Sequence, residues 1–284
     1  MSFSAYYAYK RGESRVLHPE KSERAEKVKM VFEEHRRRYG ARRIAAELKA
    51  DHGISIGRHQ TRTLMKRQNL MAIQPKSFVP KTTQSDHDSG RSDNLLLEHA
   101  VPTRPDDVYV GDITYVPLQN GKFIYLATWQ DMFTRLIVGW ELMPRMPSAL
   151  VINALIKAIN RENITKGCII HTDGGKQYAS TAFRDTLIRY GFVQSMTRKD
   201  NVYDNAMGES LFGRFKTELL QNGAFKNFED AHTEIFEYIE TYYNRKRRHS
   251  GIGYDIPVQF EQKYRDKKVS GEDEHIVSGA SERT

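Results

Sequence analysis

The order of apolar patterns between residues 107 and 222 constrains the fold of this chain more than any other feature. Three segments with strand-like alternation come first, at 107–118, 122–133 and 135–142. An Asn120-Gly121 pair between the first two predicts a tight hairpin turn, so the three segments are expected to form an antiparallel meander. After them, helical and strand-like patterns alternate, with helices expected at 147–162, 180–191 and 204–222 and short strands at 167–173 and 192–197.

This order predicts an α/β fold, because three strands followed by helix, strand, helix, strand and helix is typical of a ribonuclease H-like mixed sheet. A further helical pattern at 227–250 ends in a basic run. We therefore expect a core at 101–225, a C-terminal helical extension with a basic run at 226–268, and a disordered tail at 269–284.

The excess of basic over acidic residues lies in the first third of the chain. The net charge is +8, but residues 1–81 contain 19 Lys and Arg against 8 Asp and Glu, an excess of +11. Such a segment predicts a polyanionic partner, and without an apolar lipid-directed face nucleic acid is favoured over a membrane surface. A merely solvated charged helix is the alternative.

The same third shows three helical patterns. An amphipathic one runs from Pro19 to about Arg38; a second, at 41–53, ends at Gly53; and a third follows over 54–70, with Thr61, Leu64 and Met65 expected inside. Two short helices joined by a glycine turn predict a small all-α, helix-turn-helix-like DNA-binding domain at 1–72. The basic residues expected to contact DNA from it are Arg42, Arg43, Arg58, His59, Arg62, Lys66 and Arg67. Residues 73–100, rich in Pro, Ser, Thr and Asp at their start, are expected to form a linker.

Three acids occupy positions where a carboxylate is unusual. Asp112 lies within the first strand, Asp173 lies at the carboxyl end of the short strand at 167–173, and Glu209 lies in the first turns of the helix at 204–222. An unpaired charge in a strand is costly to bury, and the carboxyl end of a strand is where a ligand crevice forms. If the strand order is right, the three acids converge, and clustered carboxylates of this kind are best neutralised by Mg²⁺ or Mn²⁺. Two such ions could drive an in-line displacement on a phosphodiester.

The strings around these acids resemble a known family. GDITYV, HTDGGKQY and MTRKDNVYDNAMGES, with 35 residues between Asp173 and Glu209, resemble the aspartate-aspartate-glutamate integrase core of bacterial insertion-sequence transposases, akin to retroviral integrases. YYNRKRRHSGIGYDIPVQFE resembles the segment that closes that core, and YGARRIAAEL with RTLMKRQNL resembles the helix-turn-helix before it. The residues at 174–176 and before Glu209 depart from the usual pattern without touching an acid.

The resemblance implies that Asp112, Asp173 and Glu209 are catalytic metal ligands for DNA cleavage and strand transfer. It also implies two Mg²⁺ or Mn²⁺ ions per site, transposon-end and target DNA as partners, a homo-oligomer on DNA, and an upstream reading-frame product joined by frameshifting. With no apolar run of membrane-spanning length, the expected location is the cytoplasm, at the nucleoid when DNA is bound.

Several residues have two possible interpretations. His171 is expected to be a core histidine, Asp131 a turn residue, and Cys168 a buried structural thiol. Lys216, seven residues after Glu209, could meet phosphates or be solvated. Asn205 could cap a helix or contact DNA. The basic run at 245–248 could bind backbone phosphates or could be a solvated helix end, where cations are favourable. The remaining candidate DNA contacts are Tyr178, Arg198, Lys199, Tyr203, Arg245, Lys246, Arg247 and Arg248.

Two other functions remain open. A structure-selective nuclease or ribonuclease H would use the same acids, although the basic N-terminal third favours binding of DNA ends. A DNA-binding regulator with an inactive core is the second alternative, and the intact set of three acids argues against it. A third possibility is that this chain is the carboxyl-terminal half of a longer working protein, because residues 1–284 contain no heptad repeats.

Overall fold

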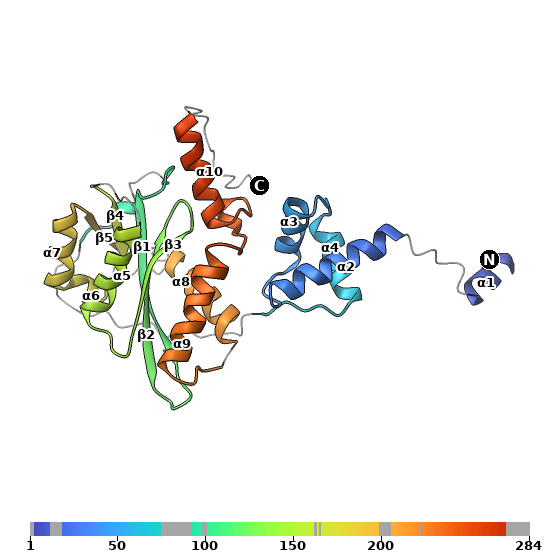
Figure 1. Ribbon diagram of the computed structural model, residues 1–284, viewed down its shortest axis with the longest axis horizontal. Coiled ribbons are helices and arrows are strands. Elements are labelled where there is room, and N and C mark those ends of the chain that lie inside the picture. Colours follow the sequence, from blue (N-terminus) through green and yellow to red (C-terminus); the bar gives the residue numbers. More distant parts are fainter. Residues whose placement is uncertain are drawn as a thin grey trace. The chain divides into compact units, whose positions relative to one another are not determined.

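A computed structural model shows the chain as two compact units, Met1–Gln74 and Pro75–Thr284. The structure describes residues 3–11, 19–74, 92–97, 101–161, 164, 166–198, 206–221 and 223–270. Figure 1 labels their helices and strands. None of the helices in these ranges is long and apolar enough to span a membrane.

The first unit contains the three expected helices and one more. They are α2 (Pro19–Glu34), α3 (Ala41–Asp51) and α4 (Arg58–Arg67), preceded by α1 (Phe3–Lys10), which the sequence patterns did not predict. Val28 and Val31 of α2 are fully buried, as is Ile44 of α3, so α2, α3 and α4 share one apolar core. The inward positions expected on α4, which are Thr61, Leu64 and Met65, are buried as predicted.

The second unit is built on a mixed five-stranded sheet in the order β3-β2-β1-β4-β5. The first three strands pair antiparallel, while β4 pairs parallel with both β1 and β5. This arrangement confirms the predicted meander and the predicted mixed sheet. The strands are β1 (Val108–Pro117), β2 (Phe123–Asp131), β3 (Ile137–Met143), β4 (Ile169–Thr172) and β5 (Val193–Met196).

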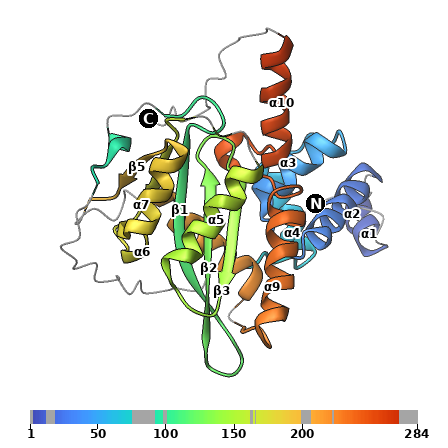
Figure 2. The ribbon, with the colours of Figure 1, turned by 60° about the vertical axis from the view of Figure 1, so that its left-hand side comes forward.

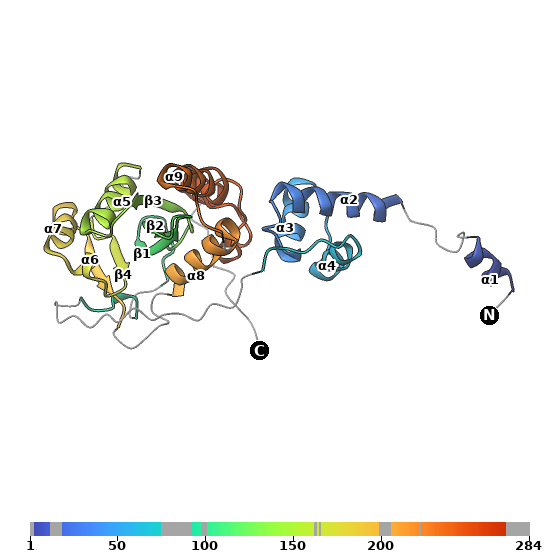
Figure 3. The ribbon, with the colours of Figure 1, turned by 90° about the horizontal axis from the view of Figure 1, so that it is seen from below.

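Helices lie on both faces of this sheet. In Figure 3, α5 (Ser148–Arg161), α6 (Lys176–Ala179) and α7 (Thr181–Tyr190) lie on one side of the strands, and α8 (Ala206–Phe215) and α9 (Phe228–Phe236) lie on the other. Two π-helical segments extend the second group: η3 (Lys216–Leu220) continues α8, and η4 (Glu237–Tyr243) continues α9. The chain then passes through η5 (Ser250–Ile252) into α10 (Pro257–Ser270).

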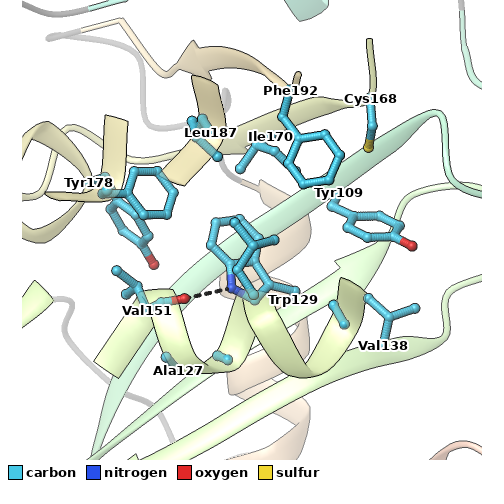
Figure 4. Close-up of a cluster of buried hydrophobic side chains, with 14 of the residues drawn as sticks. Tyr109, Ala127, Trp129, Val138, Val151, Cys168, Ile170, Tyr178, Leu187 and Phe192 are labelled. Atoms are coloured by element: carbon cyan, nitrogen blue, oxygen red, sulfur yellow. Dashed lines mark hydrogen bonds between the residues drawn. The ribbon is translucent and has the colours of Figure 1, made fainter. Parts of the chain in front are cut away.

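The main core lies between the sheet and the helices α5 to α7 (Figure 4). Trp129 of β2 is fully buried there, and its indole nitrogen donates to the Val151 carbonyl of α5 over 3.1 Å. Two glycines allow the close packing. A Cβ on Gly111 would lie 2.2 Å from the Trp129 ring, and one on Gly139 would lie 2.2 Å from the Ala154 carbonyl oxygen.

Part of the range expected as a linker is attached to the sheet. Residues 92–97, which include η1 (Leu95–Leu97), run along β5. The Asp93 carbonyl accepts from the Met196 amide over 3.2 Å, and the Leu95 amide donates to the Ser195 hydroxyl over 3.0 Å. The second unit therefore includes residues before the expected boundary at 101. Residues 75–91 and 98–100 of the expected linker, and 271–284 of the expected tail, lie outside the described ranges. Val269 and Ser270, which the expected tail included, form the end of α10.

Candidate active site

Asp112 and Asp173 lie side by side because of the parallel register between β1 and β4. Val110 of β1 pairs with His171 of β4, and each aspartate follows its paired residue by two positions. Side chains two residues apart in a strand point to the same face, so continuing the register places the two carboxylates next to each other on one face. The sequence pattern predicted the place of each aspartate in its own strand. The pairing of β1 with β4 brings the two aspartates together.

Backbone amides orient both aspartates. Asp112 is half-buried, and its Oδ1 accepts a hydrogen bond from the Ile113 amide over 2.8 Å. Asp173 is also half-buried, and its Oδ1 accepts from the Gly175 amide over 3.0 Å. A Cβ on Gly175 would lie only 3.0 Å from that same oxygen, so a residue without a side chain suits this turn.

Glu209 approaches from a helix on the same side of the sheet as Asp112. It lies in the first turn of α8, which contacts β1, and its side chain is exposed. Gly208, Leu211, Phe212 and Phe215 form the buried side of α8. The expected helix opening at 204–205, including Asn205, lies outside the described residues.

The three acids interact electrostatically. Burial, followed by the negative charges of Asp173 and then Glu209, raises the pKa of Asp112 to about 8, against the opposing effects of the Ile113 amide and Lys216. Both other carboxylates are therefore near enough to disfavour the ionised form of Asp112. Among the described residues, however, no three His, Cys, Asp or Glu side chains lie close enough together to hold one ion.

This donor set fits a divalent cation of the hard type. All three groups supply carboxylate oxygens, the ligands that Mg²⁺ and Mn²⁺ prefer. The pKa of Asp112 is raised first by burial and then by the charges of Asp173 and Glu209, and a bound cation would oppose both effects. Movement of the exposed Glu209 toward the two aspartates would complete such a site, since the aspartates are held by the sheet.

Lys216, the first residue of η3, lies close to the acids. Its ammonium group lies 4.5 Å from the centre of the Tyr115 ring. Burial lowers the pKa of Lys216, and the charge of Asp112 opposes that effect. The expected proximity to the site is therefore present, and a cation there can meet the phosphate groups of a nucleic acid.

Three lesser candidates have structural roles. His171 is buried, as expected, and its Nδ1 lies 2.8 Å from the Ser195 hydroxyl. Asp131 is a turn residue, as expected: its Oδ1 accepts from the amides of Phe133 and Thr134 over 2.8 and 2.6 Å. Cys168 is a buried free thiol whose pKa is raised by burial.

Three of the expected DNA contacts were wrong because their side chains are buried. Tyr178 packs edge-on against Trp129 and Phe183 in the main core (Figure 4). Arg247 is 1% exposed and pairs with Glu218, and Arg248 is 4% exposed and donates to the Tyr254 carbonyl. A basic run in sequence does not show which of its members face inward.

The other candidate contacts differ in exposure. Arg43 is half-buried, with its guanidinium 5.7 Å from the centre of the Tyr39 ring. Lys199, Tyr203 and Asn205 lie outside the described residues. The exposed candidates are Arg42, Arg58, His59, Arg62, Lys66, Arg67, Arg198, Arg245 and Lys246.

Sequence reasoning missed a buried polar network behind the site. Glu218 of η3 accepts two hydrogen bonds from Arg247, at 2.8 and 2.7 Å, and one from the Tyr238 hydroxyl at 3.0 Å. This network joins the segment that follows α8 to η4. No spacing rule links residues 218 and 247, so their pairing becomes visible only in the folded chain.

Comparison with known families gives matches along most of the chain. Residues 102–202 and 209–264 each match a family described as "Integrase core domain", and residues 20–78 match one described as "HTH-like domain". The first match includes Asp112 and Asp173, and the second begins at Glu209.

Named relatives are similar over more than four fifths of the chain. The transposase for insertion sequence element IS904 of Lactococcus lactis is 41% identical over 240 residues, covering 84% of this chain and 93% of the relative. The chain belongs to the insertion-sequence transposases. The transposase InsF for insertion sequence IS3A of Escherichia coli is 36% identical over 236 residues, which cover 83% of this transposase and 81% of the relative.

Solved structures of viral integrases are similar to the transposase at low identity. One is a chain of the simian T-cell lymphotropic virus intasome in complex with PP2A regulatory subunit B56 gamma, which is 16% identical in sequence. The alignment covers 90% of the transposase and 78% of that chain, with a TM-score of 0.48. Another is the HTLV-2 integrase catalytic core domain in complex with magnesium, which is 17% identical in sequence. The alignment covers 56% of the transposase and 97% of that domain, with a TM-score of 0.39.

Proposed function

We propose that this transposase cleaves DNA at insertion-sequence ends and joins the freed strands to target DNA, using Asp112, Asp173 and Glu209 as its catalytic residues. The observation that carries the assignment is the parallel register that places Asp112 and Asp173 side by side, with Glu209 on the helix facing Asp112. The likeness to named transposases over more than four fifths of the chain supports the choice of DNA ends over a general nuclease substrate.

The three carboxylates would hold two divalent cations, Mg²⁺ or Mn²⁺, which supply Lewis-acid activation of the attacking hydroxyl and stabilise the leaving oxygen. The protein's own residues do the positioning. Asp112 and Asp173 are held by backbone amides on a rigid sheet, and Lys216 supplies a positive charge beside them. An in-line phosphoryl transfer needs mainly position and electrostatic stabilisation, so no covalent protein intermediate is required.

The partners follow from this activity. Exposed basic residues of α4 would bind the transposon end, and two ends must be brought together, so we propose a homo-oligomer assembled on DNA in the cytoplasm, at the nucleoid. An upstream reading-frame product is a further proposed partner. The exposed contacts proposed for the second unit are Arg198, Arg245 and Lys246, with Lys216 near the acids.

The decisive experiment compares wild type and Asp173→Asn on DNA that carries the terminal repeats of the element. Wild type with Mg²⁺ or Mn²⁺ should give nicked or joined products, and the variant should lose at least about a thousandfold in rate, because a ligand position is lost without a change in shape. Equal activity of the variant would overturn the assignment. Calorimetry with DNA present tests the inactive-regulator alternative, which requires that neither metal be taken up.

A further inference from the structure

The hairpin that joins β1 to β2 presents two exposed aromatic rings close to the candidate active site. Tyr115 of β1 is 46% exposed and Phe123 of β2 is 50% exposed. Their ring centres lie 5.7 Å apart at an interplanar angle of 79°. We call Tyr115 and Phe123 the aromatic pair. Thr114 and Val116 beside Tyr115 are buried on the opposite face of β1, and the main core does not include either ring of the aromatic pair.

The hairpin is held rigidly. Its turn is closed by the Leu118 amide, which donates to the Lys122 carbonyl over 2.8 Å. Beyond the turn, Phe225 is tied to the hairpin: its amide donates to the Pro117 carbonyl over 3.1 Å, and its carbonyl accepts from the Gln119 amide over 2.8 Å. Phe225 follows η3, which begins at Lys216, by five residues. Its hydrogen bonds therefore connect the hairpin to the segment that carries Lys216. Figure 2 shows this hairpin extending beyond the end of the sheet.

The charge around the aromatic pair is positive. The Lys216 ammonium lies 4.5 Å from the centre of the Tyr115 ring, and Lys122 beside Phe123 is exposed. The sequence has no acidic residue between Asp112 and Asp131, so the hairpin itself carries no negative charge. Aromatic faces next to cations are the combination by which proteins hold unpaired nucleotides, with bases on the rings and phosphates at the cations.

The distance to the acids fits a nucleotide near the reacting phosphate. Lys216 links Tyr115 to Asp112, because its ammonium contacts the Tyr115 ring and the charge of Asp112 acts on it. Along β1, Tyr115 follows Asp112 by three residues, so its side chain starts from the opposite face of the strand, at about 10 Å for 3.3 Å per residue. That is about three base steps at 3.4 Å per step along one strand. A base inside a duplex is stacked on both faces, so a ring can stack on such a base only after it leaves the duplex.

From these observations we propose that the aromatic pair is a stacking site for an unpaired base at the DNA end, within about three nucleotides of the phosphate that reacts at Asp112 and Asp173. The proposal rests on the proposed function for its choice of DNA. It assigns Tyr115 and Phe123 a binding role, with Lys216 as the neighbouring phosphate contact.

The test measures binding without catalysis. Full-length protein is titrated in the absence of divalent metal into three fluorescein-labelled duplexes of one sequence: blunt, with a three-nucleotide dT overhang, and with the same overhang lacking its bases. Wild type should bind the dT overhang roughly tenfold more tightly than the abasic overhang, which is the size expected for stacking one base. Equal affinity of wild type for the two overhangs would overturn the proposal.

Variants locate the effect. Tyr115→Ala/Phe123→Ala should lose the preference for bases while binding the blunt duplex as wild type does, and Tyr115→Phe should keep the preference because stacking needs the ring and not the hydroxyl. Phe236→Ala is the matched control, since Phe236 of α9 is 51% exposed and lies outside the hairpin. A base preference that survives in the double variant overturns the proposal. Because no cleavage is measured, failure here is distinguishable from failure of Asp173→Asn to abolish activity.

Discussion

At the scale of single residues, the absence of a side chain at Gly111 is as important to the site as the carboxylate that follows it. Gly111 pairs with Trp129 across β1 and β2, and the Trp129 ring occupies the space where a Cβ would stand. The ring reaches across β1 on the face opposite Asp112, since adjacent strand residues point to opposite faces. The position of Asp112 therefore depends on a close contact one residue away.

We predict that Gly111→Ala destabilises the second unit by about 1–3 kcal/mol, because the added methyl group overpacks the core against Trp129. Urea unfolding followed by tryptophan fluorescence measures this directly, since Trp129 and Trp140 both belong to the second unit. The matched control is Gly213→Ala on α8, where a Cβ meets nothing within 4 Å. That variant should be neutral or more stable by up to about 1 kcal/mol, because alanine favours a helix. Equal urea midpoints for the two variants would contradict the prediction.

At the scale of elements, the helix that bears Glu209 continues into a segment that is anchored by a buried ion pair. α8 runs directly into η3, where Glu218 pairs with Arg247 from the turn after η4. Asn244 extends the connection to the sheet, since its side chain accepts from the Ile137 amide and donates to the Ile137 carbonyl, each over 3.0 Å. Glu209 lies nine residues before Glu218 and is exposed, so its side chain is more than two helical turns from this anchor.

We predict that Arg247→Met destabilises the second unit by about 3–5 kcal/mol, because it leaves the Glu218 carboxylate buried without its partner. The double variant Glu218→Leu/Arg247→Met should recover most of that loss, since no isolated charge remains. Both free energies of unfolding can be obtained from urea titrations. If the single variant lies within about 1 kcal/mol of wild type, Arg247 is not the structural residue that its burial indicates.

At the scale of the whole molecule, we expect the first unit to recognise DNA and the second unit to carry out the chemistry. The basic excess of the chain lies in residues 1–81, and α4 exposes Arg58, Arg62, Lys66 and Arg67. The acids and the aromatic pair all belong to the second unit. We therefore expect most of the salt dependence of duplex binding to come from the first unit and the base preference at the DNA end to come from the second.

We predict that Arg58→Gln/Arg62→Gln weakens duplex binding and makes the slope of log K against log salt shallower by about 2, because each lost phosphate contact contributes about 0.9. Anisotropy titrations at several salt concentrations give the slope. The charge-matched control is Lys166→Gln/Arg189→Gln, which removes two exposed cations from the second unit. A control whose slope falls as much as that of the test variant would show that overall charge, and not α4, determines the dependence.

The sequence by itself determined the order of the five strands with α5, α7 and α8, the mixed sheet, and the elements on which the three acids lie. Alternation at 107–118 and the apolar run before Asp173 are local patterns, and local patterns follow from the periodicity of strands and helices. The buried face of α4, the core histidine at 171 and the turn role of Asp131 were predictable for the same reason.

Only the tertiary structure decided which residues meet. The register of β1 with β4 places Asp112 beside Asp173. Tyr178 is buried in the main core, and Arg247 of the basic run is buried in an ion pair with Glu218. These outcomes depend on contacts between residues far apart in the chain. The periodicity of strands and helices in the sequence does not predict such contacts. The same holds for Lys216 and Tyr115, a hundred positions apart in sequence, whose cation and ring lie 4.5 Å apart beside the acids.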